Sequence, residues 1–222
     1  RALIRGLLLY ARVGSKEKNF ETVDTQQAYE DALKNLQLAI EESGAKITHD
    51  EWPEVYGDPI QITQLFQNLI SNAIKFHGED PLTIHITARK HDAFWRFTVR
   101  DNGIGIDMKH QDRIFLIFQR LHPRGTYPGT GIGLSVCKRI VARHGGSIWV
   151  DSHPDRGATF GFTLPVVTAE LAQSPEAEPT AETVAEAPTE SSDEKPGMPS
   201  KAPNGSEIAA KTDAPIRKPA QR

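Results

Sequence analysis

The chain has 222 residues, of which 38% are hydrophobic and 25% are charged, and this composition is ordinary for a soluble globular protein of about one domain with appended segments. Its formal net charge of -3 gives no overall basic surface, so charge does not indicate a nucleic acid or an anionic membrane as partner. Cys137 is the only cysteine, which excludes an intramolecular disulfide and favours a reducing, cytoplasmic setting.

The N-terminal residues, 1–15, have the apolar spacing of a short amphipathic helix, as in Leu3, Leu7 and Tyr10. The apolar run is too short to span a membrane, which takes roughly 18 residues. Because an isolated helix of this length is marginal in water, we expect its apolar stripe to pack on a partner outside this sequence. The first residue is not Met, and we expect the chain to be a fragment that lacks upstream domains.

The next helix is expected from Thr25, a typical N-cap, to about Ser43, where Gly44 ends it. Short strands are expected before it, at 21–24, and after it, at 45–49. These elements open the folded body of the chain.

Asp58 and Pro59 form a strong helix start, because Asp can cap free N–H groups and Pro fits the first turn. This helix should continue to about Phe76. Beyond it, two β-type runs at 82–90 and 94–100 predict a hairpin.

A long segment from Gly103 to Thr130 is rich in glycine, proline and charge, with one apolar island at 114–118. Loops of this length inside a compact domain are usually functional. A helix at 131–144 and a strand pair at 147–151 and 158–165 complete the predicted body.

This mixture of helices and strands predicts an α+β fold, a two-layer sandwich in which helices cover one face of a mixed sheet. From residue 168 onwards the chain has no aromatic residue and many Pro, Ala and Glu, which is typical of a disordered tail. We therefore expect three regions: the end of a helix at 1–15, a folded domain at 16–167 and a tail at 168–222.

Four polar residues share one face of the helix after Asp58, namely Gln64, Asn68, Asn72 and Lys75. An amide oxygen suits Mg²⁺, and a lysine suits phosphate oxygens. Asn is a mediocre helix former, so two of them in mid-helix need an explanation. A solvated helix face would show the same pattern, and the stripe alone does not decide between the two interpretations.

The run from Asp101 to Ile106, DNGIGI, follows a predicted strand and combines a carboxylate with two glycines. A fixed carboxylate can accept a hydrogen bond from an exocyclic amine such as that of adenine, and glycine lets the backbone lie close to a flat ring. A turn in which Asp101 bonds its own backbone is the alternative.

The run Gly129 to Leu134, GTGIGL, opens the last predicted helix. Bare N–H groups at a helix N-terminus favour an anion, so a polyphosphate site is physically reasonable. The spacing fits neither the dinucleotide fingerprint nor the Walker loop, and a simple tight loop remains the alternative.

Taken in order, four motifs resemble the N, G1, F and G2 boxes of sensor histidine kinases, whose wider superfamily includes gyrase and heat-shock chaperone ATPases. The motifs are QNLISNAIKF at 67–76, DNGIGI at 101–106, IFLIFQRLH at 114–122 and GTGIGLSVCKRIVARHGGSIWVDS at 129–152. The stretch before GTGIGL looks most like phytochrome-type and PAS-linked kinases, and residues 3–14 resemble the end of a second dimerisation helix. The likeness implies the Bergerat ATP-binding fold.

The resemblance implies a role for each motif residue. Asn72 would hold Mg²⁺ with Asn68 and Lys75 beside it, and Asp101 would bind the adenine amine. The remaining roles are assigned in sets: Gly103, Gly105 and Ile106 at the purine; Phe115 and Phe118 as seats of a lid; Arg120 and Arg124 at the γ-phosphate; Gly129, Thr130, Gly131, Gly133 and Leu134 around the phosphates.

The family resemblance also indicates one departure, because many members have Glu where this sequence has Gln64, and Gln cannot act as a base. Catalysis would then depend on positioning and on Mg²⁺. None of the eight histidines has the surroundings of the family's acceptor, and we expect all of them to be structural or solvated.

The function implied is a histidine kinase that binds ATP and Mg²⁺ and phosphorylates a histidine on a dimerisation helix outside this sequence. Implied partners are a response regulator and a second copy of the intact protein. Two alternatives stay open: a non-catalytic nucleotide-binding docking module, and an ATPase of the gyrase and chaperone type.

Overall fold

The computed structural model of the protein describes residues 2–15, 19–123 and 126–168. Arg124 and nearly all of the predicted tail lie outside these residues, so the expectations for them stay predictions. No helix within the described ranges has the length and apolarity to cross a membrane.

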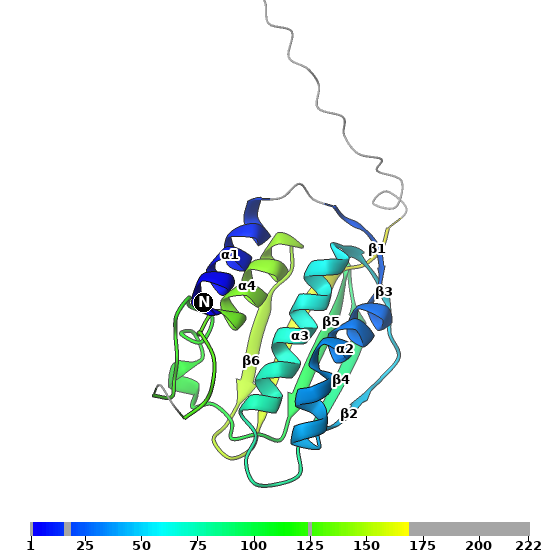
Figure 1. The fold of residues 1–222 in the computed structure, drawn as a ribbon. Coiled ribbons are helices and arrows are strands. Elements are labelled where there is room, and N and C mark those ends of the chain that lie inside the picture. Colours follow the sequence, from blue (N-terminus) through cyan, green and yellow to red (C-terminus); the bar gives the residue numbers. More distant parts are fainter. Residues whose placement is uncertain (1, 16–18, 124–125, 169–222) are drawn as a thin grey trace, which may run out of the picture. The chain divides into compact units, whose positions relative to one another are not determined.

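A five-stranded mixed sheet forms one layer of the fold, with strand order β2-β4-β5-β7-β6 (Figure 1). Its strands are β2 (Lys46–His49), β4 (Thr83–His91), β5 (Phe94–Asp101), β6 (Ile148–Ser152) and β7 (Ala158–Pro165). Only the β2–β4 pair is parallel among the described strands. The predicted hairpin is the β4–β5 pair, and the predicted strand pair is β6–β7.

A second, two-stranded sheet pairs β1 (Glu21–Asp24) with β3 (Glu54–Gly57). The sequence did not predict β3, because this run has only two apolar residues and Pro precedes it. The pairing places Asp58, the N-cap of helix α3 (Pro59–Lys75), directly after a strand.

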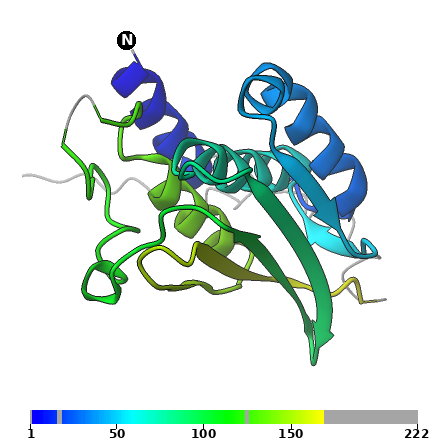
Figure 2. The ribbon, with the colours of Figure 1, turned by 90° about the horizontal axis from the view of Figure 1, so that it is seen from below.

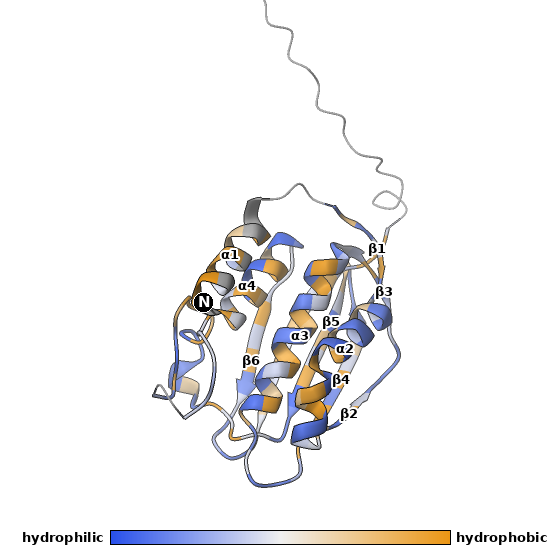
Figure 3. Cartoon of the chain, in the orientation of Figure 1, coloured by the Kyte–Doolittle hydropathy of each residue, from blue (hydrophilic) through white to orange (hydrophobic). Residues whose placement is uncertain are grey.

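Helices α2 (Thr25–Ser43), α3 (Pro59–Lys75) and α4 (Gly133–Arg143) lie on the same face of the five-stranded sheet (Figure 2). Along β4 and β5 the side chains alternate, so that residues such as Ile86, Phe97 and Val99 face the helices and are buried. Apolar stretches of α3 and α4 are orange in Figure 3. The predicted two-layer α+β sandwich is confirmed.

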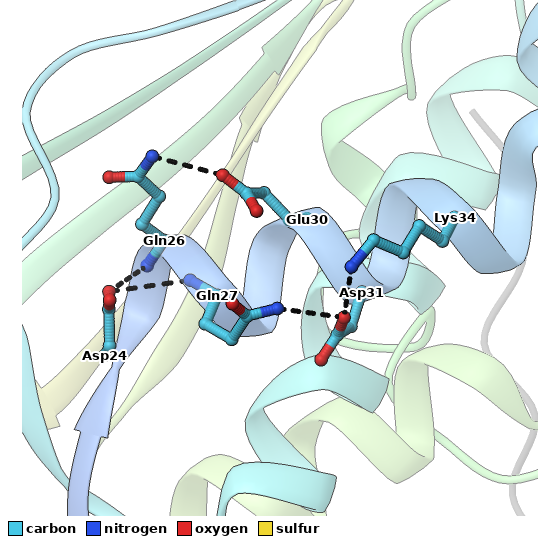
Figure 4. A network of polar contacts seen from close by, with 6 residues as sticks. All are labelled: Asp24, Gln26, Gln27, Glu30, Asp31 and Lys34. Atoms are coloured by element: carbon cyan, nitrogen blue, oxygen red, sulfur yellow. Dashed lines mark hydrogen bonds and ion pairs between the residues drawn. The ribbon is translucent and has the colours of Figure 1, made fainter.

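The N-terminus of α2 is capped by Asp24, and the prediction that Thr25 is the cap is wrong. Figure 4 shows the Asp24 carboxylate accepting hydrogen bonds from the backbone N–H groups of Gln26 and Gln27, at 2.8 and 3.4 Å. Thr25 is the first helical residue and donates its hydroxyl to the Pro53 carbonyl oxygen instead. The helix ends as predicted at Gly44, which has φ +62°.

Helix α1 (Ala2–Ser15) packs along α4, which differs from the expectation that its apolar stripe needs a partner outside the sequence. Val13 is buried, its carbonyl oxygen accepts a bond from Arg143 at 2.7 Å, and Arg139 lies 4.5 Å from the Tyr10 ring centroid. On another part of the helix, Ile4 and Leu8 remain 64% and 54% exposed. Only part of the stripe is therefore covered.

Candidate functional site

A cavity of about 460 Å³ lies between α3, the end of β5, the segment that follows β5, and the start of α4. This volume is in the range of small-molecule sites. Twelve of the site residues predicted from the sequence line it: Asn68, Asn72, Lys75, Asp101, Gly105, Ile106, Arg120, Gly129, Thr130, Gly131, Gly133 and Leu134. Motifs spread over more than 60 positions of the chain therefore meet around one space.

Asp101 ends β5 and supplies a buried carboxylate to one end of the cavity. Its Oδ1 accepts hydrogen bonds from the backbone N–H groups of Gly103, at 2.8 Å, and Ala158, at 3.1 Å. Burial raises the pKa of this carboxyl, and the two N–H groups partly offset that effect. Because both bonds use Oδ1, Oδ2 is left to accept a bond from a ligand.

The two glycines after Asp101 let the main chain of this segment lie in close contact with the main chain of other segments. A side chain at Gly103 would collide with the Phe76 carbonyl oxygen, and Ile104 donates its N–H to that same oxygen at 3.0 Å. Gly105 has φ +71°, and a Cβ there would collide with the His153 carbonyl oxygen. Gly103 lies behind the wall of the cavity, and Gly105 lines it.

Helix α3 gives the cavity an amide wall. Asn68 and Asn72 line it one helical turn apart, and the Asn68 side chain also bonds the buried Cys137 thiol. The Asn68 Oδ1 atom accepts a bond from the Gln64 Nε2 atom at 3.3 Å. Amide groups can both donate hydrogen bonds to a ligand and accept them from it, so this wall suits a polar ligand.

Two cations, Lys75 and Arg120, line a part of the wall that we call the cationic end. Burial, and then the charge of Arg120, lower the pKa of Lys75. The Arg120 guanidinium donates to the carbonyl oxygens of Gly129, at 2.6 Å, and Tyr127, at 2.8 Å. Two positive side chains that share one wall favour an anionic ligand there.

The start of α4 completes the site with backbone N–H groups. The N-cap residue of α4 is Ile132, which has no side chain able to cap, whereas Asp24 and Asp58 cap α2 and α3. The first N–H groups of α4 are therefore available to an anion, as the predicted polyphosphate site requires. Gly133 lies beside Asn68, with its Cβ direction 3.7 Å from the Asn68 Oδ1 atom.

Residues 57–168, about half of the chain, match the family described as histidine kinase-, DNA gyrase B- and HSP90-like ATPases. The chain belongs to this ATPase family. Cyanobacterial phytochrome A of Nostoc sp. is 51% identical over 166 residues, which are 75% of this chain and 22% of that protein. Phytochrome-like protein Cph1 of Synechocystis sp. is 46% identical over the same shares of the two chains.

A third relative, the adaptive-response sensory kinase SasA of Thermosynechococcus vestitus, is 37% identical over 74% of this chain and 44% of its own length. The chain therefore spans less than half the length of these relatives. Among solved structures, full-length ShkA in complex with AMPPNP is similar with a TM-score of 0.64 at 28% identity, over 75% of this chain and 36% of ShkA. The catalytic domain of histidine kinase ThkA has a TM-score of 0.57 at 27% identity, over 66% of this chain and 97% of that domain.

Within this ATPase fold, four predicted site residues among those described do not line the cavity: Gln64, Gly103, Phe115 and Phe118. Gln64 contacts the site only through Asn68, and Phe115 is buried beside the lining residue Ile114. Phe118, the other expected lid seat, has φ +63° and is 49% exposed, so the structure does not bring it into the lining.

The sequence analysis missed other lining residues, among them Phe76, Gln119, Leu121, His122, Tyr127 and Phe160. His122 was expected to be structural or solvated, and the structure places it half-buried in the cavity wall. The sequence did contain an indication of their role, because His122 and Tyr127 are two aromatic residues just before the glycine run. In the structure both rings contact Phe76, the aromatic residue at the end of α3.

No group of three or more His, Cys, Asp or Glu side chains that could hold a metal is found in the described part of the chain. The donor set at the cavity is instead a single amide stripe, and the Asn72 amide makes no side-chain hydrogen bond to another described residue. Mg²⁺ is commonly held by one or two protein oxygens together with substrate phosphates and water. Asn72 fits that chemistry, and a metal site built wholly from protein does not.

Proposed function

We propose that this chain is the catalytic part of a sensor histidine kinase, which binds ATP with Mg²⁺ and transfers the γ-phosphoryl group to a histidine of a dimerisation helix. The observation that carries the proposal is the polarity of the cavity. One cavity is lined by a buried carboxylate, Asp101, and by two cations, Lys75 and Arg120. This combination matches a nucleotide, whose base carries an amine and whose phosphates are anionic.

At the carboxylate end, Asp101 Oδ2 would accept a hydrogen bond from the adenine amine. Apolar lining residues, Ile104, Ile106 and Phe160, would contact the faces and edge of the ring. Gly105 supports this arrangement, because its backbone packs against the His153 carbonyl oxygen. A side chain at position 105 would collide with that oxygen and displace the cavity wall.

At the cationic end, the uncapped N-terminus of α4 would receive the phosphates together with Lys75 and Arg120. Asn72 would hold Mg²⁺, which supplies positive charge against the phosphate oxygens. The Asn68 amide, which lines the cavity, would donate to a phosphate oxygen or to a metal-bound water.

In the transfer step, a nitrogen of the acceptor imidazole forms the new bond to the γ-phosphorus while the bond from that phosphorus to the bridging oxygen breaks. ADP leaves with the electron pair of the broken bond. Gln64 cannot take a proton, and the role of this chain is to position the triphosphate and stabilise its charge.

The acceptor histidine is proposed to lie on another segment. All eight histidines are among the described residues, and none lies inside α1, α2, α3 or α4. His144 caps α4 and is buried, with its Nε2 accepting from the Asp58 N–H group at 3.0 Å. We propose further that the intact protein is a cytoplasmic homodimer that passes its phosphoryl group to a response regulator.

The test combines binding with transfer. Calorimetry of the chain with ATP and Mg²⁺ should show association, and a polypeptide carrying the acceptor helix should become labelled at histidine when γ-labelled ATP is added. The Asn72→Ala variant serves as the matched control for label transfer. Absence of nucleotide binding would overturn the proposal, while binding without transfer to any acceptor helix would favour the docking-module alternative.

A further inference from the structure

Three half-buried rings, those of Phe76, His122 and Tyr127, meet at the cationic end of the cavity. The ring centroids are 5.0 Å apart for Phe76 and Tyr127, 5.9 Å for Phe76 and His122, and 4.9 Å for His122 and Tyr127. Each ring contacts the other two. This aromatic cluster joins the C-cap residue of α3 to the segment between β5 and α4.

The aromatic cluster fixes the place of Lys75. The Lys75 Nζ atom lies 4.2 Å from the centroid of the Phe76 ring, within the range of a cation–π contact. The Phe76 ring is itself held by Tyr127 and His122. A change in the Tyr127 ring therefore reaches Lys75 through Phe76.

The main chain of Tyr127 fixes the place of the second cation. The Arg120 Nη2 atom donates to the Tyr127 carbonyl oxygen at 2.8 Å, and its Nη1 atom donates to the Gly129 carbonyl oxygen at 2.6 Å. Tyr127 thus contacts Arg120 through its backbone carbonyl oxygen. Its side chain contacts Phe76, the ring on which Lys75 lies. Gly129 also lies against both cations, through its carbonyl oxygen and through its place beside the Lys75 Nζ atom, but it has no side chain to contribute.

We propose that Tyr127 is a positioning residue that sets where Lys75 and Arg120 lie, and through them the preference of the cavity for a nucleoside triphosphate over a diphosphate. The inference rests on the proposed function, because it takes the cationic end as the phosphate end. The proposed function assigns Lys75 and Arg120 to the outermost phosphate. If Lys75 and Arg120 are displaced, the binding of a nucleoside triphosphate is therefore weakened more than the binding of a diphosphate.

A ring that only fills space predicts a different result. If the aromatic cluster served packing alone, removal of one ring would loosen the wall and weaken both nucleotides by the same factor. The ratio of the two dissociation constants separates these cases, because a purely structural role does not change it.

The experiment uses the 222-residue chain and measures, by calorimetry with Mg²⁺, the dissociation constants of AMPPNP and of ADP. Tyr127→Ala is expected to lower the preference for AMPPNP over ADP by about tenfold, and His122→Ala by about threefold, as for loss of a partly desolvated cation–π support. Tyr127→Phe keeps the ring and the carbonyl, so its preference should equal that of the unaltered chain. Leu116→Ala is the matched control, because Leu116 belongs to the same segment, is 53% exposed and does not line the cavity.

Thermal unfolding of each variant shows whether it folds, and His122→Ala decides the question if Tyr127→Ala does not fold. The inference is overturned if these alanine variants weaken both nucleotides equally, or if Tyr127→Phe loses the preference as fully as Tyr127→Ala. If the unaltered chain binds neither nucleotide, the proposed function itself is overturned. A chain that binds both nucleotides, with an unchanged ratio in the variants, overturns only the role of Tyr127.

Discussion

The two ends of the cavity are built in opposite ways. At the carboxylate end, Asp101 is buried and held by two backbone N–H groups, and its neighbours Gly103 and Gly105 lie against other backbone. At the cationic end, Lys75 rests on a ring, and Arg120 is bonded to carbonyl oxygens of a loop. One end is fixed by the core of the fold, and the other by side chains that a ligand can compete for.

This difference indicates how recognition and reaction are divided. A base that must be recognised in one orientation benefits from a preorganised acceptor, since little conformational entropy is lost on binding. The cations are held by a ring contact and by loop carbonyl oxygens, and the loss of one such contact leaves the others in place. We therefore expect changes at the carboxylate end to remove binding, and changes at the cationic end to reduce it.

The largest effect is expected for Asp101→Asn. An amide in place of the carboxylate removes the charged acceptor, and we expect the dissociation constant of ATP to rise by about 100-fold, as for loss of a hydrogen bond to a charged group. Calorimetry measures it. The neighbouring Asn102→Ala is the control, because the Asn102 side chain bonds Thr83 and Pro81 away from the cavity. Unchanged binding in Asp101→Asn would contradict the assignment of the carboxylate end.

A smaller loss is expected for Asn72→Ala, and only when magnesium is present. The variant lacks the amide oxygen proposed to hold the ion, so the gain in ATP affinity that Mg²⁺ produces should fall by about tenfold. Titrations with Mg²⁺ and with a chelator give that gain directly. Asn35→Ala, on the exposed side of α2, should keep it. An equal gain in both variants would show that Asn72 does not meet the ion.

Gly129→Ala should weaken ATP by about fivefold, since a non-glycine residue in an unfavourable backbone conformation costs about 1–3 kcal/mol, part of it borne by the free chain. Gly129 has φ +141°, and a Cβ there would lie 2.7 Å from the Lys75 Nζ atom. Gly78→Ala is the control, because nothing lies within 4 Å of its Cβ position. If both variants bind ATP alike, the loop at Gly129 does not set the place of Lys75.

Nucleotide affinity should also depend on pH, and it should fall on both the acidic and the alkaline side. Asp101 accepts the amine bond when ionised, and because burial raises its pKa, binding weakens with falling pH earlier than for an ordinary Asp, whose pKa is about 3.9. At alkaline pH, Lys75 loses its charge below the usual range, since burial and Arg120 lower its pKa. Calorimetry between pH 5 and 9 tests both limbs; Asp101→Asn should lack the acidic one.

No change in nucleotide affinity is expected for Asp58→Ala, although the fold should lose about 1 kcal/mol. Asp58 caps α3 by accepting bonds from the Gln61 backbone and side chain, at 3.1 and 2.7 Å. Denaturant unfolding measures the loss, and calorimetry the affinity. The contrast with α4 would weaken if this variant lost ATP binding while remaining folded, because the capped helix start would then also serve the ligand.

How far the sequence predicts the molecule depends on the range of the interaction. The span of α2 and the start and length of α3 follow from local signals, such as Gly44 and the pair Asp58 and Pro59, and they were predicted within one residue. The cap of α2 was predicted one residue late, because Thr25 and Asp24 are both good N-cap residues. What distinguishes them is a hydrogen bond from the Thr25 hydroxyl to the carbonyl oxygen of Pro53, which is distant in sequence. Strand β3 was missed because its partner, β1, lies more than 30 positions away.

The candidate site shows the same division. The sequence by itself determined the chemistry, since the amides of α3, the carboxylate of Asp101 and the glycines before α4 are properties of residue type and local spacing. Only the tertiary structure decided which of them share a cavity, that Gln64 bonds Asn68 outside the lining, and that Tyr127 contacts both Arg120 and the ring beside Lys75. The reason is physical: a motif fixes its own backbone through bonds a few residues long, whereas the order of strands and the packing of α3 and α4 on them set the distances between motifs.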